Sequence, residues 1–390
     1  MIEKIKKLAS NYKQECIEIR QHLHTHPELS YEEYNTSLYI QAKLTEWSIP
    51  FIIMAKTGVV GLIQGNTNSE RVVALRADID ALPITEENEV AYKSKNVGVM
   101  HACGHDVHTA CLLGAAKILN QTKDEWSGIV KLIFQPGEEK NPGGASLLIA
   151  EGVLKNPAPQ KIFGLHVHNI LQAGQFSFKG GMVMASADEI YITIKGKGGH
   201  AAAPQLTADI ILIASQLVVS LQQIVSRNNN AFNPTILTIT SIQGGTATNI
   251  IPSEVKLMGT FRAMNEEWRY KAHELIKNQT LLLVKALGAE AEINIEVGYP
   301  FVKNDEALTA TAMKLAKQYA GANNVSETEL RMGAEDFAYY SQKIPACFYR
   351  LGVGNIAKNI TIGVHTPTFN IDEDAIEHGV GMMAWLGAMG

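Results

Sequence analysis

Several potential metal ligands are concentrated in residues 101–106, which read HACGHD. Cys103 and His105 stand two positions apart, and alternate residues of an extended loop project to the same side. A thiolate and an imidazole both suit a borderline-soft ion such as zinc. Two ligands do not complete a zinc site, so further carboxylates or histidines must come from other segments. Taken alone, the cluster is equally compatible with a loop that carries a buried cysteine and solvated histidines.

Further ligand-type residues follow apolar runs that predict strands. An apolar run that predicts a buried strand precedes Glu138 and Glu139. In such a pair, one carboxylate can bind a cation while its neighbour holds a water molecule as general base. The run 161–168 predicts another strand, which ends in His166 and His168. Because ligand sites of α/β sheets lie beyond the carboxyl ends of the strands, this recurrence favours a metal site over a solvated acidic turn.

Other polar residues could support or complete such a site. His365 lies in a loop ahead of the predicted C-terminal helix and could supply a distant ligand. Asp78 and Asp80 follow the strand predicted over 71–75, and either could orient a ligand histidine or cap a turn. A structural or cleft-lining role is favoured for three histidines that lack carboxylate or cysteine partners nearby, namely His22, His24 and His26.

Composition limits the classes of protein to consider. The chain has 390 residues, more than one hydrophobic core usually serves, so two domains are expected. A net charge of -5 argues against a nucleic-acid-binding surface. The charged N-terminal segment predicts an amphipathic helix rather than a signal peptide, and no run is interpreted as a membrane span. Four scattered cysteines fit a reducing compartment. A cytoplasmic protein without nucleic-acid or membrane partners is therefore expected.

The order of the predicted elements indicates one domain inserted in another. In the middle of the chain the order is β-α-β-β-α-β, the split βαβ arrangement with two helices on one face of an antiparallel sheet. The flanking segments alternate strands and helices, which predicts an α/β class with a central sheet flanked by helices. The predicted metal-binding domain comprises residues 1–181 and 298–390, and the ferredoxin-like insertion comprises residues 182–297. Hinges between them are expected near Gly180 and Gly298.

A series of motifs along nearly the whole chain resembles the zinc-dependent aminoacylase/carboxypeptidase metallopeptidases. The resemblance is to the amidohydrolase branch, which includes hippurate, auxin-conjugate and N-acetyl-diaminopimelate hydrolases. In chain order the motifs are HPELSYEE, RADIDALP, HACGHD, QPGEE, GLHV, GKGGHAAAP, GGTATNIIP, GTFRA, GAEDFAYY and HTPTFNIDEDA. The resemblance implies a catalytic domain with a mixed central sheet, interrupted by a lid that also serves in dimerisation.

The resemblance also implies a dinuclear metal centre. Cys103 corresponds to the bridging ligand and replaces the aspartate of other branches, and Glu138 corresponds to the general base. The remaining implied ligands are His105, Glu139, His166 and His365. Two divalent ions are expected. The ligand types favour zinc and leave manganese, nickel and cobalt open.

Three residues of the insertion are implied as substrate-binding groups. His200 would stabilise the oxyanion from the partner subunit of a homodimer formed through the lid, and Asn249 would make a polar contact. Arg262 has a guanidinium suited to bidentate capture of a carboxylate, as an N-acyl amino acid would present. Without the resemblance, His200 would be interpreted as a surface turn residue and Arg262 as a solvated charge.

The predicted function is hydrolysis of the amide bond of small N-acyl amino acids to a carboxylate and a free amino acid. A dipeptidase or carboxypeptidase on the same metal centre is the nearest alternative, because both reactions need the same groups. A cysteine hydrolase that uses Cys103 with His105 as base is an alternative of different chemistry. A non-catalytic binding protein is a third alternative, disfavoured because metal binding alone does not require Glu138. The sequence assigns no role to His168.

Overall fold

The computed structural model describes residues 1–66 and 69–390, which form two compact units. Unit 1 consists of Met1–Val183, Lys303–Glu329 and Asp336–Gly390, and unit 2 consists of Met184–Val302 and Leu330–Glu335. The short segment Leu330–Glu335 thus packs with unit 2, although the sequence pattern placed it among the flanking elements. The functional division into a metal-binding domain and a lid stays a prediction.

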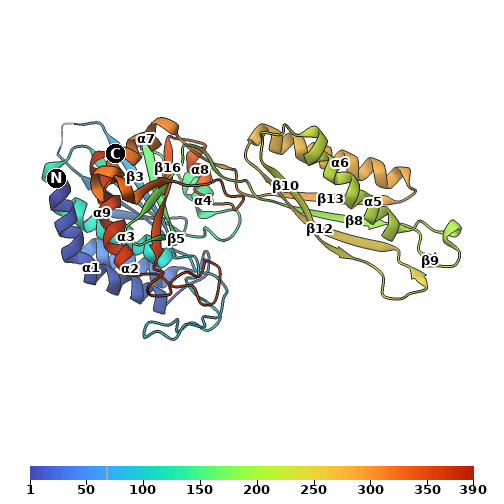
Figure 1. Ribbon diagram of the computed structural model, residues 1–390, viewed down its shortest axis with the longest axis horizontal. Helices are drawn as coiled ribbons and strands as arrows, with labels where there is room; N and C mark the ends of the chain where they lie inside the picture. Colours follow the sequence, from blue (N-terminus) through green and yellow to red (C-terminus); the bar gives the residue numbers. More distant parts are fainter. Residues whose placement is uncertain (67–68) are drawn as a thin grey trace. The chain divides into compact units, whose positions relative to one another are not determined.

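Unit 1 is built on an eight-stranded sheet (Figure 1). Its strands are β1 (Phe51–Met54), β2 (Gly58–Gln64), β3 (Val72–Asp78), β4 (Ile129–Gln135), β5 (Lys161–Gln172), β6 (Phe176–Phe178), β15 (Val325–Glu327) and β16 (Ala346–Gly354). Their order is β1-β2-β4-β3-β5-β16-β6-β15. The central strands β4, β3, β5 and β16 run parallel, whereas β1, β2 and β6 pair antiparallel with their inner neighbours. The sheet is therefore mixed, which confirms the predicted fold class.

Helices cover both faces of this sheet. They are α1 (Ile2–Thr25), α2 (Tyr34–Glu46), α3 (His105–Gln121), α4 (Gly144–Ala150), α7 (Glu306–Ala320), α8 (Ala338–Ser341) and α9 (Asp374–Met389). Helices α1, α3 and α9 pack against one another. Alternation along β16 separates the two faces, because Cys347 and Tyr349 belong to the core shared with α9, whereas Phe348 stacks on Phe337 just ahead of α8.

Helix α3 begins earlier than the sequence predicted. The sequence pattern placed Cys103 and His105 in an extended loop, so the helix was expected to begin only after them. Gly104 instead has φ 86 and turns the chain directly into α3 at His105. A Cβ atom at Gly104 would lie 2.6 Å from a methyl group of Val167, so glycine also meets a steric requirement here. The extended-loop interpretation was wrong, and a glycine turn is what brings Cys103 and His105 to one side.

Strand β5 is longer than predicted, because it continues past His168 to Gln172. Its pairing with β3 ends at Gly164, opposite Arg76. His166 therefore lies inside a strand, two residues past this last pair and level with Asp78 at the end of β3. On its other side His166 pairs with Arg350 of β16.

Unit 2 has a four-stranded antiparallel sheet with two helices on one face (Figure 1). The strands are β8 (Asp188–Lys195), β10 (Thr235–Gln243), β12 (Glu254–Ala263) and β13 (Glu290–Val297), and the helices are α5 (Ile210–Gln223) and α6 (Glu266–Ala286). The strand order β10-β12-β8-β13 is that of the predicted split βαβ arrangement. Two short ribbons complete the described strands, β9 (Gly199–His200) with β11 (Ile250–Ile251) and β7 (Gly181–Met184) with β14 (Val302–Asn304).

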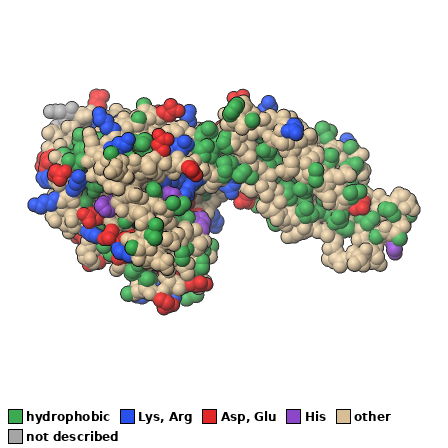
Figure 2. All heavy atoms as spheres, in the orientation of Figure 1, with side chains coloured by type: hydrophobic (Ala, Val, Ile, Leu, Met, Phe, Trp, Pro, Cys, Tyr) green, Lys and Arg blue, Asp and Glu red, His purple; other side chains and the backbone are tan. Residues whose placement is uncertain are grey.

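Helix α5 has an apolar outer face in addition to its core face. Ile213, Leu217 and Leu221 are buried in the core of unit 2, whereas Leu212 is 54% and Val219 is 74% exposed. Figure 2 shows hydrophobic side chains gathered over this helix. Within the described part of the chain, one helical stretch, Ile210–Asn228, is long and apolar enough to cross a membrane by length and composition alone. No run was interpreted as a membrane span from the sequence, and this stretch departs from that expectation in length and composition only.

The backbone of Gly298, where a hinge was expected, is held on both sides. Its N–H donates to Asp188 Oδ1 at 3.2 Å, and its carbonyl accepts from Arg269 at 3.0 Å. Asp188 is itself buried and paired with Arg269 and His273. A hinge at Gly298 would have to break two buried hydrogen bonds, so a pivot is better sought at residues that lack such contacts.

Candidate metal centre

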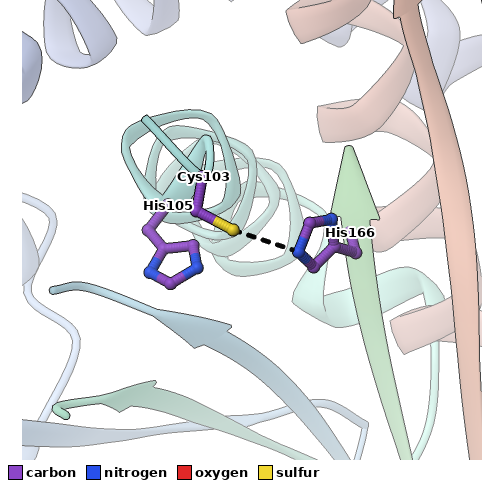
Figure 3. Close-up of side chains that lie close together, drawn as sticks. All are labelled: Cys103, His105 and His166. Atoms are coloured by element: carbon purple, nitrogen blue, oxygen red, sulfur yellow. Dashed lines mark hydrogen bonds between the residues drawn. The ribbon is translucent and has the colours of Figure 1, made fainter. Parts of the chain in front are cut away.

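The five predicted ligands all lie in unit 1 and converge there. Cys103 Sγ lies 3.4 Å from His166 Nε2 (Figure 3) and 3.3 Å from His365 Nε2. Glu139 Oε1 lies 3.3 Å from His365 Nε2 and 3.9 Å from His105 Nε2. The loop before α3, the first turn of α3, the turn after β4, strand β5 and the loop before α9 each supply one of these side chains. Segments more than 260 residues apart in the chain thus meet at one point.

Two groups of potential ligand atoms share Cys103. One group adds His105 and His166 and the other adds Glu139 and His365, and within each group the atoms lie within 4.8 Å of one another. A thiolate has several lone pairs, so one sulfur atom in both groups could bridge two cations. The arrangement is therefore suited to a pair of ions rather than to a single one.

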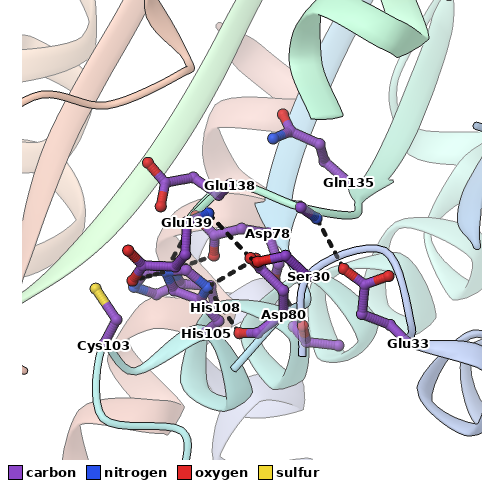
Figure 4. Close-up of polar contacts among 12 residues, drawn as sticks. Ser30, Glu33, Asp78, Asp80, Cys103, His105, His108, Gln135, Glu138 and Glu139 are labelled. Carbon is purple, nitrogen blue, oxygen red and sulfur yellow. Dashed lines mark hydrogen bonds and ion pairs between the residues drawn. The ribbon is translucent and has the colours of Figure 1, made fainter. Parts of the chain in front are cut away.

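Unsatisfied buried atoms point to the same place. Among the described residues, His105 Nε2 and Glu139 Oε1 are buried and have no hydrogen-bond partner. The other ring nitrogen of His105, Nδ1, lies 2.9 Å from the Asp80 carbonyl oxygen and 3.2 Å from Asp80 Oδ1 (Figure 4). Both neighbours are acceptors, so Nδ1 carries a proton in either charge state, and Nε2 is the ring nitrogen that can bind a cation once its own proton is lost. A bound cation would satisfy both orphaned atoms, so the residues fit a metal ion.

His166 has the corresponding tautomer. Its Nδ1 lies 2.9 Å from the Val167 carbonyl oxygen, so Nδ1 carries the proton and Nε2 presents its lone pair toward Cys103. Burial lowers the pKa of His166 well below its usual range, and the nearby His108 and Arg350 act in the same direction. A neutral imidazole is the form that binds a metal ion.

The electrostatic field of the cluster favours a cation. Burial opposes protonation of His105, but the carboxylates of Asp78 and Asp80 outweigh it and raise the pKa of His105 to about 10. Burial, together with the carboxylates of Glu139 and Glu138, raises the pKa of the Cys103 thiol well above its usual range. Without a metal ion the cluster therefore holds protons on these two ligands. A metal ion would replace them, so binding should release protons and weaken as the pH falls.

Glu138 lies beside the ligand cluster. One carboxylate oxygen of Glu138 lies within 4.8 Å of ligand atoms of His105 and Glu139, and the side chain is buried. Its Oε1 accepts a hydrogen bond from the backbone N–H of Asp336 at 3.4 Å. A carboxylate held next to a candidate metal pair can accept a proton from a water molecule there.

His108 supports the ligand cluster through hydrogen bonds, and the sequence predicted no role for it. Its ring lies near His105, and the carboxylate of Asp78 completes a third group that could hold a cation by composition. However, His108 Nδ1 lies 2.5 Å from Asp78 Oδ1, and its Nε2 accepts the Val167 N–H at 3.0 Å. Both ring nitrogens are thus engaged in hydrogen bonds. His108 links β3 to the residue after His166, which suits a supporting role rather than a ligand role.

A buried ionic network fixes the first turn of α3. Asp106 Oδ2 accepts hydrogen bonds from Arg20 Nε at 2.7 Å and from His24 Nδ1 at 2.8 Å. His24 Nε2 in turn lies 3.1 Å from Glu86 Oε1. These side chains are all buried, so they anchor the turn that carries the neighbouring candidate ligand His105. His24 therefore has the structural role that the sequence favoured.

His101 should make the folded state sensitive to acid. It is 2% exposed, and burial lowers its pKa from 6.5 to about 4. The unfolded chain therefore binds this proton at a higher pH than the folded chain, so stability is lost as the pH falls through this interval. When the pH is lowered from 7 to 5, this histidine should reduce the free energy of unfolding by about 2 kcal/mol. Urea unfolding of the metal-free protein, with His101→Leu as reference, measures the difference. An equal loss in both proteins would contradict the assignment.

The three substrate-binding residues expected from the insertion lie in unit 2, at two different places. His200 is exposed in β9 and pairs with Ile250, next to Asn249, so the structure brings His200 and Asn249 together. Arg262 lies in β12, where its neighbour Phe261 pairs with Asp188 at the start of β8. The short strands β9 and β11 adjoin the opposite end of this sheet, where Glu254 pairs with Lys195.

The separation between these two places follows from the strand register. Asp188 and Lys195 mark the two ends of β8. At the usual rise per residue of a strand, these ends are roughly 20 Å apart. His200 and Arg262 of one chain therefore cannot contact the same small molecule. The structure of unit 2 thus separates two groups that the sequence assigned to one substrate.

Comparisons with known proteins agree with this geometry. The model of a family described as Peptidase family M20/M25/M40 matches residues 74–386. The chain is 38% identical over 383 residues to thermostable carboxypeptidase 2 of Saccharolobus solfataricus, covering 97% of this chain and 96% of that protein. It is 40% identical over 362 residues to N-acetylcysteine deacetylase of Bacillus subtilis, covering 92% of each. The Bacillus subtilis YXEP protein, described as a dinuclear metal binding peptidase, has a similar structure, with a TM-score of 0.84, 35% identity and coverage of 97% of this chain and 98% of that one.

Proposed function

Because this chain belongs to peptidase family M20/M25/M40, it is a metal-dependent hydrolase of amide bonds, and we propose that it acts on small N-acyl amino acids. The products would be a carboxylate and a free amino acid. The observation that carries this proposal is that Cys103 is common to two groups of ligand atoms, with Glu138 beside them. A centre of this kind suits hydrolysis by an activated water molecule.

We assign the metal ligands as Cys103, His105, Glu139, His166 and His365, with two ions bound. Zinc is proposed because thiolate and imidazole ligands suit it, and manganese, nickel and cobalt are the alternatives for the same site. Bound cations would lower the pKa of a water molecule toward neutrality and polarise the amide carbonyl group. The Asp80 and Val167 acceptors keep the Nε2 lone pairs of the two buried histidines available for the ions.

Glu138 is proposed as the general base and then as the general acid. Its carboxylate takes a proton from the attacking water molecule as the new C–O bond forms at the amide carbon. The same proton then passes to the amide nitrogen as the C–N bond breaks, so the leaving group departs as a neutral amine. Arg262 would bind the carboxylate of the amino-acid part of the substrate, because a guanidinium and a carboxylate form two parallel hydrogen bonds.

Removal of the metal with a chelator tests this proposal. Protein purified without added metal should contain about two equivalents of metal and should hydrolyse N-acyl amino acids, and a chelator should abolish this activity. Elemental analysis and turnover of a panel of N-acetyl and N-benzoyl amino acids and dipeptides, before and after chelation, provide the measurement. Higher kcat/KM for dipeptides throughout the panel would favour the alternative of a dipeptidase or carboxypeptidase. Chelator-resistant activity that is lost on thiol alkylation would favour the cysteine hydrolase.

We also propose that the enzyme works as a homodimer formed through unit 2. Support comes from the separation of His200 and Arg262 within unit 2, which is roughly 20 Å along the length of β8. Arg262 lies at the end of the sheet where the chain enters and leaves unit 2, and His200 lies at the far end. A second copy could supply His200 and Asn249 to the metal centre of the first. The exposed apolar face of α5 and the edge strand β10 offer surface for such an association.

We also propose that the enzyme is located in the cytoplasm, because its four cysteines are free thiols, as a reducing compartment would keep them.

Mixing two inactive variants should restore activity if the dimer is built this way. His200→Ala would damage the group supplied to a partner, and Glu138→Gln would damage the base of the chain's own site. A heterodimer of the two variants then has one intact site, so a fully exchanged equal mixture should recover about a quarter of wild-type activity. Turnover is measured before and after exchange, with molar mass determined by light scattering. A dimer that shows no recovery would mean that His200 acts within its own chain or not at all.

A further inference from the structure

The loop between α1 and α2 contacts the segment that carries Glu138 and Glu139. We call residues 30–33 the strap and residues 136–143 the glutamate loop. The strap is the end of the sequence motif HPELSYEE, and the glutamate loop begins within the motif QPGEE; only the second motif received a chemical role above. Figure 4 shows Ser30 and Glu33 of the strap beside the residues that surround Glu138 and Glu139. The contacts between the two segments are specific and involve both sides of the glutamate pair.

Glu33 binds the glutamate loop on its N-terminal side. Its Oε1 accepts the backbone N–H of Gly137 at 2.8 Å, and its Oε2 accepts the hydroxyl of Thr57 at 2.8 Å. The side chain is fully buried, and burial, with the charge of Asp80, raises the pKa of Glu33 to about 7. Burying a carboxyl group is costly, and an apolar residue would fill the space at lower cost. The hydrogen bond to Gly137 is what an apolar residue could not provide.

Tyr31 binds the same loop on its C-terminal side. Its hydroxyl group donates to the Lys140 carbonyl oxygen at 2.5 Å and accepts the Gly143 N–H at 3.0 Å. Its ring packs so closely on Gly137 that a Cβ atom there would lie 2.2 Å from a ring carbon. Tyr31 itself has φ 69, a conformation that is unfavourable for a bulky residue. Strain at a residue that makes these contacts indicates that the contacts are maintained by the surrounding structure.

Ser30 adds a third link. Its hydroxyl group donates to Asp80 Oδ2 at 2.7 Å, and the same oxygen accepts the backbone N–H of Glu139 at 3.0 Å. The other oxygen of Asp80 lies 3.2 Å from His105 Nδ1. Ser30 therefore links the strap to the carboxylate of Asp80. That carboxylate contacts the side chain of His105 and the backbone N–H of Glu139, which are both candidate ligands. Glu138 and Glu139 lie between two anchored points, Gly137 and Lys140, so their backbone has little freedom.

We propose that Tyr31 and Glu33 are positioning residues of the reaction, which act through the backbone of the glutamate loop to set where Glu138 and Glu139 lie. The inference rests on the proposed function, because it takes Glu138 as the base and Glu139 as a metal ligand. Displacement of a catalytic group by about 1 Å can lower a rate by about 100-fold, so a small shift of this loop has a large effect. Neither Tyr31 nor Glu33 belongs to the groups of candidate ligand atoms among the described residues.

Tyr31→Phe tests the C-terminal anchor, because it removes the hydroxyl group and keeps the ring on Gly137. We expect kcat to fall about 10-fold with KM changed less than about twofold, and the affinity for zinc to fall about 10-fold. Zinc affinity is measured by competition with a chromophoric chelator, and the absorption spectrum of the cobalt-loaded protein reports ligand geometry. Tyr34→Phe is the matched control, since this tyrosine is three residues away and half exposed. It should leave all of these quantities unchanged.

Glu33 tests the N-terminal anchor through a pair of substitutions. Glu33→Ala removes the acceptor of the Gly137 N–H and should lower kcat and zinc affinity by about 10-fold or more. Glu33→Gln keeps an acceptor oxygen of the same shape and should restore both to within about threefold of wild type. Glu32→Ala is the control at the adjacent exposed position. If Glu33→Ala does not fold, the comparison of Tyr31→Phe with Tyr34→Phe decides the question by itself.

The possible results separate this inference from the proposed function. Wild-type kcat and zinc affinity in Tyr31→Phe would overturn the positioning role, whatever the enzyme hydrolyses. A loss confined to KM would also overturn it, because that result would place the strap in substrate binding. Full activity of Glu138→Gln, used as a reference in the same assay, would instead refute the proposed base. In that case the zinc affinities and cobalt spectra of the strap variants still test the positioning of Glu139.

Discussion

Glu138→Gln should lower kcat by roughly 10²–10⁴-fold while the protein still binds its full complement of metal. Glutamine has nearly the same shape as glutamate, and its side-chain oxygen can still accept the Asp336 N–H. It cannot take a proton from a water molecule at neutral pH, so the two proton transfers of the reaction lose their carrier. Steady-state kinetics on the best N-acyl amino acid, with metal analysis of the same preparation, provides the measurement.

The adjacent glutamate is the matched control for this experiment. Glu139→Gln makes the same chemical change one residue away, yet it should weaken metal binding, whereas Glu138→Gln should lower kcat and leave metal binding intact. Glu139 Oε1 is buried and without a hydrogen-bond partner among the described residues, beside His365 and Cys103, so its charge is needed by the ions. This variant should lose metal affinity, and added metal should restore part of its activity. Near-normal turnover of Glu138→Gln would refute the role proposed for Glu138.

The chemistry of the site was more predictable from the sequence than its construction. Neither Cys103 nor the pair Glu138 and Glu139 indicates a metal site when taken alone. The recurrence of ligand-type residues after several predicted strands is what indicated metal chemistry. His365 lies 262 positions from Cys103; its residue type and its loop suggested a distant ligand, and the resemblance of the motifs to a known family then implied the same role. The structure brings these residues within a few ångströms of one another, as the prediction required.

Among the supporting residues, the sequence suggested Asp80, which lies against His105 Nδ1, but not the others, because local sequence does not encode their contacts. The turn at Gly104 depends on a backbone angle, whereas hydrophobic periodicity reports only which residues are buried. His108 has the residue type of a ligand, and only the positions of Asp78 and Val167 show that its ring nitrogens are engaged. The contact between Glu33 and Gly137 spans 104 positions along the chain. Hydrogen bonds of this range leave no periodic pattern in the sequence.

Unit 2 shows the same distinction. The order of its strands and helices was predicted, because each element has its own hydrophobic pattern. The separation of His200 from Arg262 follows from strand register, because Arg262 lies near the start of β8 and His200 lies in the β9–β11 ribbon beyond the other end of β8. Neither residue's neighbours in the sequence contain that information. This separation is the physical argument for a second copy of the chain, and the sequence offered only the family resemblance for it.

Cys103→Ala should remove the shared ligand and so eliminate both metal binding and activity. Cys103 belongs to both groups of candidate ligand atoms, and its sulfur lies 3.4 Å from His166 Nε2 and 3.3 Å from His365 Nε2. Without it, each group keeps only two of its ligands. We expect zinc affinity to fall at least about 100-fold and kcat/KM to fall to that of the metal-free protein. Elemental analysis after dialysis and kinetics with and without added zinc measure both effects.

Cys103→Asp separates a bridging ligand from a nucleophile. An aspartate carboxylate has two oxygen atoms that can each bind an ion, so this variant should retain two metal ions and recover part of the activity lost in Cys103→Ala. A cysteine nucleophile could not be replaced in this way, because aspartate would not form the thioester that such a mechanism requires. The buried thiol also has a raised pKa, so without a metal ion it would be a weak nucleophile. An inactive Cys103→Asp that still binds two ions, together with chelator-resistant activity of the wild-type protein, would reverse the assignment and make Cys103 the reacting group.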